Sequence, residues 1–323
     1  MQSDISFQRL TYSGLDPSLA FDIVYGGHFE HRLLSARHST LEHQRLTLPG
    51  VLLETGRYDF PVVARGVMPK DVVCIGLMAD GAEVTRYNTA AIESDEIQVY
   101  PSGSDLLYHA TGASRWINFI VPETVLQSAA LAHAGRPLSL PKREAVSIRL
   151  PTGGRKHLAQ LADDAFALGR SLETTGIATP LARSVGLGLV ESYAAALCTA
   201  TQTDRKRTIA AQQHLRLILA CERLAVSEDV LTVELDNIAR RSGYGRRSLE
   251  LIFNRTLGMP PGRWFLNIRL NGVMRELLMA TSDCRIATVA SQWGFQHLSR
   301  FAYQYHRAFG ELPSATLNRS PMR

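Results

Sequence analysis

Two segments near the C-terminus share one pattern, and this repeat constrains the fold more than any other feature of the sequence. In residues 235–258 and 286–310, an alanine precedes a glycine by four positions, and apolar residues follow the glycine about one helical turn apart. A small alanine lets two helices cross closely, glycine permits a left-handed turn, and the later apolar residues pack the second helix across the first. The sequence therefore predicts two helix-turn-helix units, whose second helices present a polar face to the DNA major groove.

The two units differ by one residue. Leu249 and Phe253 follow the first glycine by six and ten positions, whereas Phe301 and Tyr305 follow the second by seven and eleven. The extra residue lies either in the turn of the second unit or at the start of its second helix. A single unit of this kind is an ordinary helical hairpin about as often as it is a DNA-binding unit. Two such units in tandem favour a DNA-binding pair.

A long helix is predicted between the two units. In residues 260–280, Pro261 suits the first turn of a helix, and apolar residues from Trp264 to Leu277 form a stripe. Such a helix would hold the two units at a fixed separation. Two recognition helices about 34 Å apart would enter successive major grooves on one face of the DNA.

The charge distribution agrees with a nucleic-acid partner for this part of the chain. From Arg205 onward there are 18 Lys and Arg, of which 17 are Arg, against nine Asp and Glu. The preceding 204 residues contain 17 Lys and Arg against 21 Asp and Glu, so the net charge of +5 combines an acidic and a basic part. Because arginine suits bidentate contacts with phosphate and guanine, the basic part is predicted to face nucleic acid.

The acidic part has a different character. Between residues 15 and 121, short apolar or alternating runs are separated by Gly, Pro and Asp turn signals, which predicts a β-sandwich or β-barrel. Residues 157–172 and 180–200 have Ala and Leu at helical spacing, which predicts two helices that pack on the β region or on a second subunit. Residues 201–208 are polar and lack apolar periodicity, as in a linker.

The first unit contains the run IARRSGYGRRSLELIFNRTLGMPPGRWF, and the second contains VASQWGFQHLSRFAYQYHRAFGELPSATL. With these runs, residues 210–318 resemble the DNA-binding domain of the AraC/XylS family of bacterial transcription regulators, and GFQHLSRFAYQYHRAFGELPS is most similar to the XylS-type branch. The earlier part resembles the cupin-like effector domain of that branch, without a sharp motif. The resemblance implies a homodimeric, effector-binding regulator that binds double-stranded promoter DNA and activates transcription by contact with RNA polymerase.

We therefore expect an α+β multidomain chain. Residues 1–152 are predicted to form a cupin-like, effector-binding β-barrel, and residues 153–200 a helical dimerisation region. Residues 201–209 are the predicted linker, and residues 210–323 are the predicted all-α, AraC-type DNA-binding domain with two helix-turn-helix motifs.

The resemblance also indicates which residues contact DNA. Family members use the positions of Arg247, Glu250 and Leu251 for base contacts. Arg247 would bind guanine and Glu250 would accept from cytosine, whereas Leu251 is restricted to apolar contact such as that with a thymine methyl. Arg300 is the corresponding base reader of the second unit, and a phosphate contact is the alternative for each arginine. The predicted DNA-binding residues are Arg246, Arg247, Ser248, Glu250, Leu251, Gln296, His297, Leu298, Ser299, Arg300 and Tyr303.

An effector pocket is expected inside the barrel, since such pockets are mostly apolar with a few convergent polar groups. Polar and aromatic residues on the predicted strands are the candidates, namely Arg65, Tyr100, His109, Trp116 and Asn118. The XylS-type resemblance implies a small organic effector such as an aromatic acid, with a nucleotide second messenger as the alternative. Which of these binds is left open by the sequence.

A cupin-type metalloenzyme with a helical appendage is the alternative function, because His28, His31, His38 and His43 cluster in the sequence. The first two are spaced H-x-x-H, however, and side chains three apart cannot both point inward on one strand. We therefore predict neither a metal site nor a catalytic site, and no cofactor. A second alternative, a non-regulatory architectural DNA binder, would not need the barrel.

The sequence also indicates a cellular compartment. The four cysteines are scattered without a C-x-x-C pair, which argues against a disulfide scaffold and a zinc finger. The start MQSDISFQRL does not resemble a secretory signal, and no apolar run approaches the roughly 18 residues of a membrane span. We therefore expect a cytoplasmic protein without membrane contact.

Overall fold

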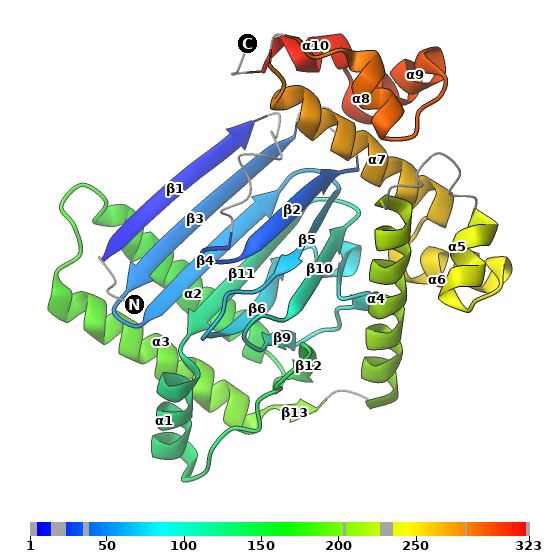
Figure 1. Ribbon diagram of the computed structural model, residues 1–323. Helices are drawn as coiled ribbons and strands as arrows, with labels where there is room; N and C mark the ends of the chain where they lie inside the picture. Colours follow the sequence, from blue (N-terminus) through cyan, green and yellow to red (C-terminus); the bar gives the residue numbers. More distant parts are fainter. Residues whose placement is uncertain are drawn as a thin grey trace.

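The computed structural model of the chain describes residues 5–13, 24–34, 39–202, 205–226, 235–281 and 283–320. Within these ranges the chain has a sheet region (residues 5–202) built on two antiparallel β-sheets and a helical region (residues 205–320), as Figure 1 shows. The prediction of a β-rich N-terminal part and a helical C-terminal part is therefore confirmed.

The larger sheet has eight strands, and it runs diagonally through the middle of Figure 1. Every neighbouring pair is antiparallel, and most neighbours in the sheet are not consecutive in the chain. The strands, in order across the sheet, are β1 (Ser6–Ser13), β3 (Thr40–Leu48), β4 (Val51–Tyr58), β11 (Ser114–Val121), β6 (Val73–Asp80), β9 (Glu96–Tyr100), β12 (Val146–Arg149) and β13 (Thr201–Gln202).

The smaller sheet has five strands and packs against one face of the larger sheet. A short 3-10 helix, η1 (Ala82–Val84), leads into one of its strands. Its strands, in order, are β2 (His28–Leu33), β5 (Val62–Val67), β10 (Asp105–Ala110), β7 (Thr85–Tyr87) and β8 (Ala90–Ala91). In the described ranges no strand pairs one sheet with the other, so the arrangement is a sandwich and a closed barrel is not confirmed.

The central strands of the larger sheet are buried on both faces, which explains the nearly continuous apolar run of β11. Trp116 and Ile120 point into the space between the sheets, whereas Ile117 and Phe119 point to the opposite face. Alternate side chains of a strand point to opposite faces, so a strand covered on both sides needs apolar residues at most positions.

Three helices cover the outer face of the larger sheet: α1 (Glu123–Ala134), α2 (Gly154–Ser171) and α3 (Thr179–Thr199). The helices α2 and α3 correspond to the predicted pair at 157–172 and 180–200, but α1 lies inside the range predicted to be the barrel. Tyr193 of α3 stacks on Phe119, with ring centroids 4.1 Å apart.

The helix α3 has 21 residues and is the one helix in the described ranges that is long and apolar enough to cross a membrane. A core helix of a folded domain has the same properties. Val190, Tyr193 and Ala194 are buried against the larger sheet, so the apolar side of α3 is used in packing.

The helical region begins earlier than the sequence predicts. Residues 201 and 202 pair with β12 as strand β13, and the next helix begins at Arg205, within the predicted linker of residues 201–209. The helices of this region are α4 (Arg205–Val226), α5 (Leu235–Ser242), α6 (Arg246–Leu257), α7 (Pro261–Leu278), α8 (Ile286–Gln292), α9 (Leu298–Phe309) and α10 (Pro313–Asn318).

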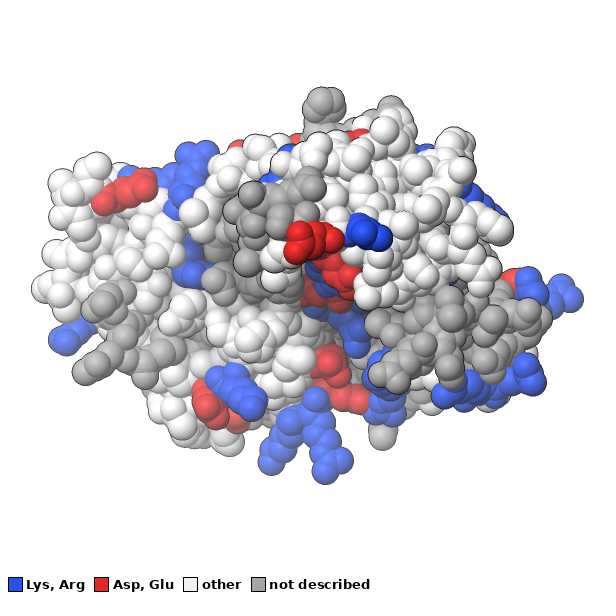
Figure 2. Space-filling view, turned by 45° about the horizontal axis from the view of Figure 1, so that its top comes forward, with Lys and Arg blue, Asp and Glu red and all other residues white. Residues whose placement is uncertain are grey.

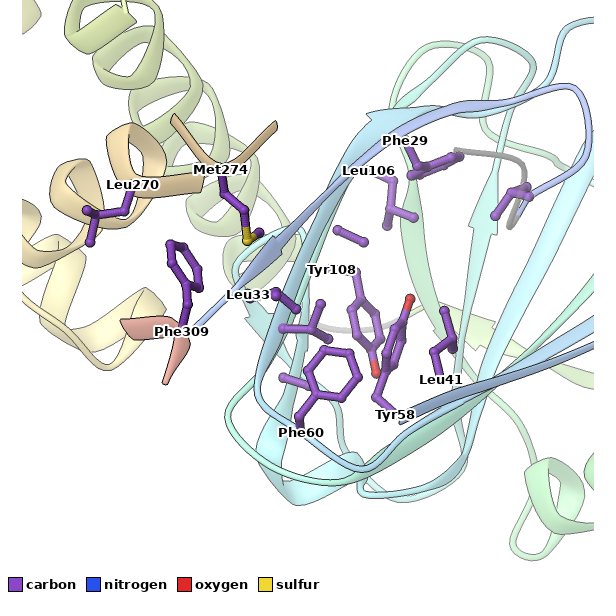
Figure 3. Close-up of a cluster of buried hydrophobic side chains, with 14 of the residues drawn as sticks. Phe29, Leu33, Leu41, Tyr58, Phe60, Leu106, Tyr108, Leu270, Met274 and Phe309 are labelled. Atoms are coloured by element: carbon purple, nitrogen blue, oxygen red, sulfur yellow. The ribbon is translucent and has the colours of Figure 1, made fainter. Parts of the chain in front are cut away.

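The sheet region and the helical region share one apolar core. Leu33, at the end of β2, lies between Phe60 on the sheet side and Met274 and Phe309 on the helical side (Figure 3). On the outer face of the smaller sheet, Val63 packs in a second shared cluster with residues of α4, α6 and α7. The two regions are therefore joined by buried apolar surface, whose removal from water favours the docked arrangement.

Candidate nucleic-acid interface

The first helix-turn-helix unit consists of α5 and α6, joined by a three-residue turn. Gly243 has φ of 76°, in the left-handed region that glycine adopts without steric cost. The Tyr244 N–H donates to the carbonyl of Ala239 at 3.0 Å and closes the end of α5. Leu249 and Phe253, the apolar residues that the pattern assigned to the core, are fully buried.

The second unit, α8 and α9, has the same construction. Gly294 also has φ of 76°, and the Phe295 N–H donates to the carbonyl of Ala290 at 2.9 Å. The helix α9 begins four positions after its glycine, whereas α6 begins three positions after Gly243. The extra residue of the second unit therefore lies in the turn, and Phe301 and Tyr305 take the same places in α9 as Leu249 and Phe253 in α6.

The helix α7 connects the units and packs against both of them. The ring of Trp293, at the end of α8, packs directly on Gly272 of α7. Any other residue at position 272 would place its Cβ 2.2 Å from this ring. The Trp293 indole N–H also donates to Glu276 at 2.8 Å. At the other end of α7, Phe265 packs edge-on against Phe253 of α6. Each unit is thus fixed to α7 by an aromatic contact.

The predicted DNA-binding residues lie on the exposed sides of α6 and α9. In the first unit Arg246, Arg247, Ser248 and Leu251 are exposed, whereas Glu250 is half-buried. Arg246 donates to Glu250 at 3.1 Å, so Glu250 would exchange this ion pair for a contact with cytosine.

The second unit presents a larger exposed group. Arg300 of α9 forms no ion pair within the described part of the chain, and the same holds for Arg247 of α6. Gln296 and His297 belong to the turn and the helix cap rather than to α9 itself. The exposed residues of this unit are Gln296, His297, Leu298, Ser299, Arg300 and Tyr303.

Lys and Arg side chains stand in separate groups on the face turned forward in Figure 2, with carboxylates beside several of them. This pattern suits contacts in which single side chains reach base edges or phosphates.

Comparisons with known proteins identify this part of the chain. A family model described as a helix-turn-helix domain matches residues 238–319. The probable thc operon regulatory protein of Rhodococcus erythropolis is 36% identical over 100 residues, which are 31% of this chain and 30% of that protein. The XylDLEGF operon transcriptional activator 2 of Pseudomonas putida is 37% identical over 93 residues, which are 28% of this chain and 59% of that protein.

Residues 238–319 form an AraC-type helix-turn-helix domain. Among solved structures, a transcriptional regulator of Chromobacterium violaceum with an AraC-type DNA-binding domain is 24% identical, with a TM-score of 0.31. That match covers 33% of this chain and 93% of the other. The chain spans less than two thirds of the length of the two curated relatives, so the likeness concerns this domain.

The helical region is held to the sheet region by a buried carboxylate. Glu222 of α4, whose side chain is 1% exposed, accepts from Arg32 at 2.7 Å, from Arg65 at 2.8 Å and from the Trp264 indole at 2.8 Å. These donors come from β2, β5 and α7. A buried charge is tolerated only when it is paired and hydrogen-bonded, so the four side chains depend on one another.

A second contact protects the edge of the smaller sheet. The Asn271 side chain of α7 accepts from the Leu33 N–H at 2.8 Å and donates to the Leu33 carbonyl at 3.1 Å. Because β2 is an edge strand, these backbone groups have no strand partner on that side. Beside this contact Glu30 of β2 pairs with Arg32 and with Arg275 of α7. The two arginines outweigh the effect of burial and lower the pKa of Glu30 to about 2.

The predicted effector residues are divided between two faces of the sandwich. Trp116, Asn118 and Tyr100 point between the sheets, as expected. Arg65 instead binds Glu222, and His109 lies edge-on to Trp264 with ring centroids 5.9 Å apart, so both face the helical region. The alternation of β5 and β10 places these two side chains on the outer face of the smaller sheet.

The space between the sheets is small. A cavity of about 20 Å³ is lined by His31, Tyr58, Trp116 and Asn118, among others, which is room for about one water molecule. His31 is bound there to the Tyr58 hydroxyl at 2.8 Å, whereas His28 on the same strand is exposed. His38 lies outside the described residues. Within the described residues no group of three or more His, Cys, Asp or Glu is placed to hold a metal ion.

Glu222, Arg32 and Asn271 are the residues that the sequence did not indicate. Glu222 and Arg32 are 190 positions apart, and each occurs in a segment without a recognisable motif. The one available signal was the position of Glu222 among apolar residues of an amphipathic helix, where a carboxylate requires a partner.

We expect Glu222→Ala to lower the free energy of unfolding by about 3–5 kcal/mol, because it leaves buried donors without their acceptor. Urea denaturation followed by tryptophan fluorescence measures the change. Asp80→Ala is the matched control, since it removes the carboxylate of an exposed ion pair with Arg57 and should cost only about 0–1 kcal/mol. Equal stability of Glu222→Ala and the wild type would contradict this role.

His109 should make stability depend on pH. Burial, together with Arg86, lowers its pKa to about 4, from a usual value near 6.5. Between these values the unfolded chain binds a proton that the folded chain does not, so stability falls as the pH falls, by about 1.4 kcal/mol per pH unit from this group. His109→Leu removes that contribution.

The stability of His109→Leu relative to the wild type should therefore increase as the pH is lowered from 7 to 4.5, measured by urea denaturation at each pH. Burial also lowers the pKa of His31 to about 4 and raises that of Glu54 to about 7. Both groups are present in wild type and variant, so the comparison cancels them. A difference that does not change with pH would show that His109 is protonated equally in the folded and unfolded states.

Proposed function

We propose that this chain is a ligand-responsive transcription regulator that activates an operon by binding promoter DNA with two recognition helices. The observation on which the proposal rests is that α6 and α9, on units fixed to one helix, both expose an arginine that forms no ion pair with any described residue, namely Arg247 and Arg300. Such side chains are available for guanine or phosphate contacts.

The length of α7 supports simultaneous binding by both units. Its 18 residues correspond to about 27 Å at 1.5 Å per residue. One turn of B-DNA is about 34 Å, so a connecting helix of this length is compatible with one unit in each of two successive grooves. We therefore propose that α6 and α9 enter successive major grooves on one face of the duplex.

The relatives support the regulatory role. The two curated relatives are named as an operon regulatory protein and an operon transcriptional activator. We propose activation through RNA polymerase on the same basis, in the cytoplasm, where promoter DNA is found. No observation in the described residues favours the metalloenzyme alternative.

The sheet region is proposed to bind the effector and to dimerise. Its two antiparallel sheets support the proposed cupin-like effector domain of residues 1–152, although they are not joined into a ring. For dimerisation by residues 153–200, the support is that α3 leaves Leu181 and Leu187 exposed, which a second copy would cover.

The regulator proposal predicts sequence-specific binding. Fluorescence anisotropy with labelled duplexes from upstream of its own gene and of neighbouring operons, across a salt series, should show tighter binding than to scrambled duplexes. Arg247→Ala and Arg300→Ala should each weaken specific binding by about 1–3 kcal/mol and relax the preference at one base position.

Arg57→Ala is the control, because Arg57 is exposed on β4, outside both units and outside the proposed dimerisation region, so binding should be unchanged. A uniform loss on all duplexes would make Arg247 and Arg300 phosphate contacts. If the wild type bound upstream and scrambled duplexes equally, the regulator proposal would be wrong.

A further inference from the structure

A larger cavity lies where the sandwich is open at one edge. The smaller sheet ends at the two-residue strand β8, whereas the larger sheet continues through β9 and β12. The helix α4 covers this opening and encloses a cavity of about 170 Å³. This volume is large enough for a small organic molecule, unlike the 20 Å³ between the sheets.

Two side chains in the cavity wall have buried polar groups that form no hydrogen bond with any described residue. Gln98 of β9 is 3% exposed, and neither its amide nitrogen nor its amide oxygen has a partner among the described residues. Tyr100, on the same face of β9, is 1% exposed, and its hydroxyl also has no hydrogen-bond partner in the described part of the chain. Buried polar groups are nearly always hydrogen-bonded, so these groups require an explanation.

The rest of the cavity indicates what would satisfy them. Leu215 and Leu219 of α4 and the ring of Tyr87 make apolar walls. The charges among the lining residues balance, because two arginines and two carboxylates are present: Arg143, Arg216, Asp105 and Glu144. Arg216 is already paired with Glu144. A balanced set of charges does not select a charged ligand. Burial raises the pKa of the Tyr100 hydroxyl, so this group remains a neutral donor or acceptor.

The neighbouring turn is shaped to hold α4 at this place. Asn88 and Thr89 between β7 and β8 have φ of 47° and 71°, and a β-branched residue such as threonine rarely adopts that conformation. The Thr89 hydroxyl donates to the Ala211 carbonyl of α4 at 2.9 Å. Strained backbone persists where the surrounding structure enforces it, often at a ligand site.

We propose that this cavity binds a small uncharged molecule with adjacent hydrogen-bond donor and acceptor, a carboxamide or cyclic imide, on Gln98 and Tyr100. The side-chain amide of Gln98 has an N–H donor next to a carbonyl acceptor. A carboxamide or cyclic imide can therefore form two hydrogen bonds with it at once. The inference rests on the proposed ligand response, and it moves the effector site from the space between the sheets to the junction with α4.

The position of α4 explains how the ligand would be sensed. Leu219 lies on the cavity, and Glu222, one turn further along the same helix, binds Arg32, Arg65 and Trp264. A ligand that contacts α4 in one arrangement and not in another shifts the equilibrium between them. The cavity is therefore connected by one helix to the AraC-type domain.

The test uses the full chain, with benzamide and succinimide as probes and benzoate as the charged comparison. Both neutral probes should raise the thermal midpoint in a saturable way, and benzoate should not. Gln98→Leu and Tyr100→Phe should weaken benzamide binding about tenfold by calorimetry. Both variants should keep or raise the thermal midpoint without ligand, because each removes an unsatisfied buried group.

Tyr193→Phe is the matched control. Its hydroxyl is equally buried and without a described partner, but it lies among α3 and the larger sheet, so the variant should bind benzamide as the wild type does. Absence of neutral-probe binding at millimolar concentration would overturn the proposal. So would unchanged binding by Gln98→Leu, or a lowered midpoint of both variants. Since the assay contains no DNA, its failure is distinct from failure of the regulator proposal.

Discussion

The buried carboxylate of Glu222 is the interaction on which the arrangement of the whole molecule depends. Removing a carboxylate from water is costly, and the fold compensates with donors from β2, β5 and α7. These donors belong to both regions of the chain. Neither region satisfies Glu222 alone, so the pairing specifies how the sheet region docks on the AraC-type domain.

The same interface also protects the edge of the smaller sheet and buries apolar surface. The side chain of Asn271 supplies the hydrogen bonds that a further strand would give to the edge of β2 at Leu33. Leu33 itself extends the apolar core of the sandwich to Met274 and Phe309 (Figure 3). Edge protection, apolar burial and charge pairing thus coincide on one strand, which ties the orientation of α7 to that of the smaller sheet. Because α7 also carries both helix-turn-helix units, the orientation of α6 and α9 follows from this contact.

Much of the helical region was predictable because its determinants are local. Gly243 and Gly294 must turn with positive φ, and the buried positions of α6 and α9 follow within three turns of helix. The sheet region was harder. Its strands are covered on both faces, so apolar alternation is weak, and β5 and β10 did not reveal which face is inward. For that reason Arg65 and His109 were expected between the sheets, although both face the helical region.

The sequence by itself determined the two helix-turn-helix units, the helix between them, the side of each recognition helix that is exposed, and the division into a β-rich and a helical part. These follow from backbone preferences and from periodicities over a few residues. Only the tertiary structure decided that the extra residue of the second unit lies in its turn, that Glu222 meets Arg32, and that a cavity of about 170 Å³ lies under α4. Those features depend on which distant segments meet, and a hydrogen bond between residues 190 positions apart leaves no local pattern in the chain.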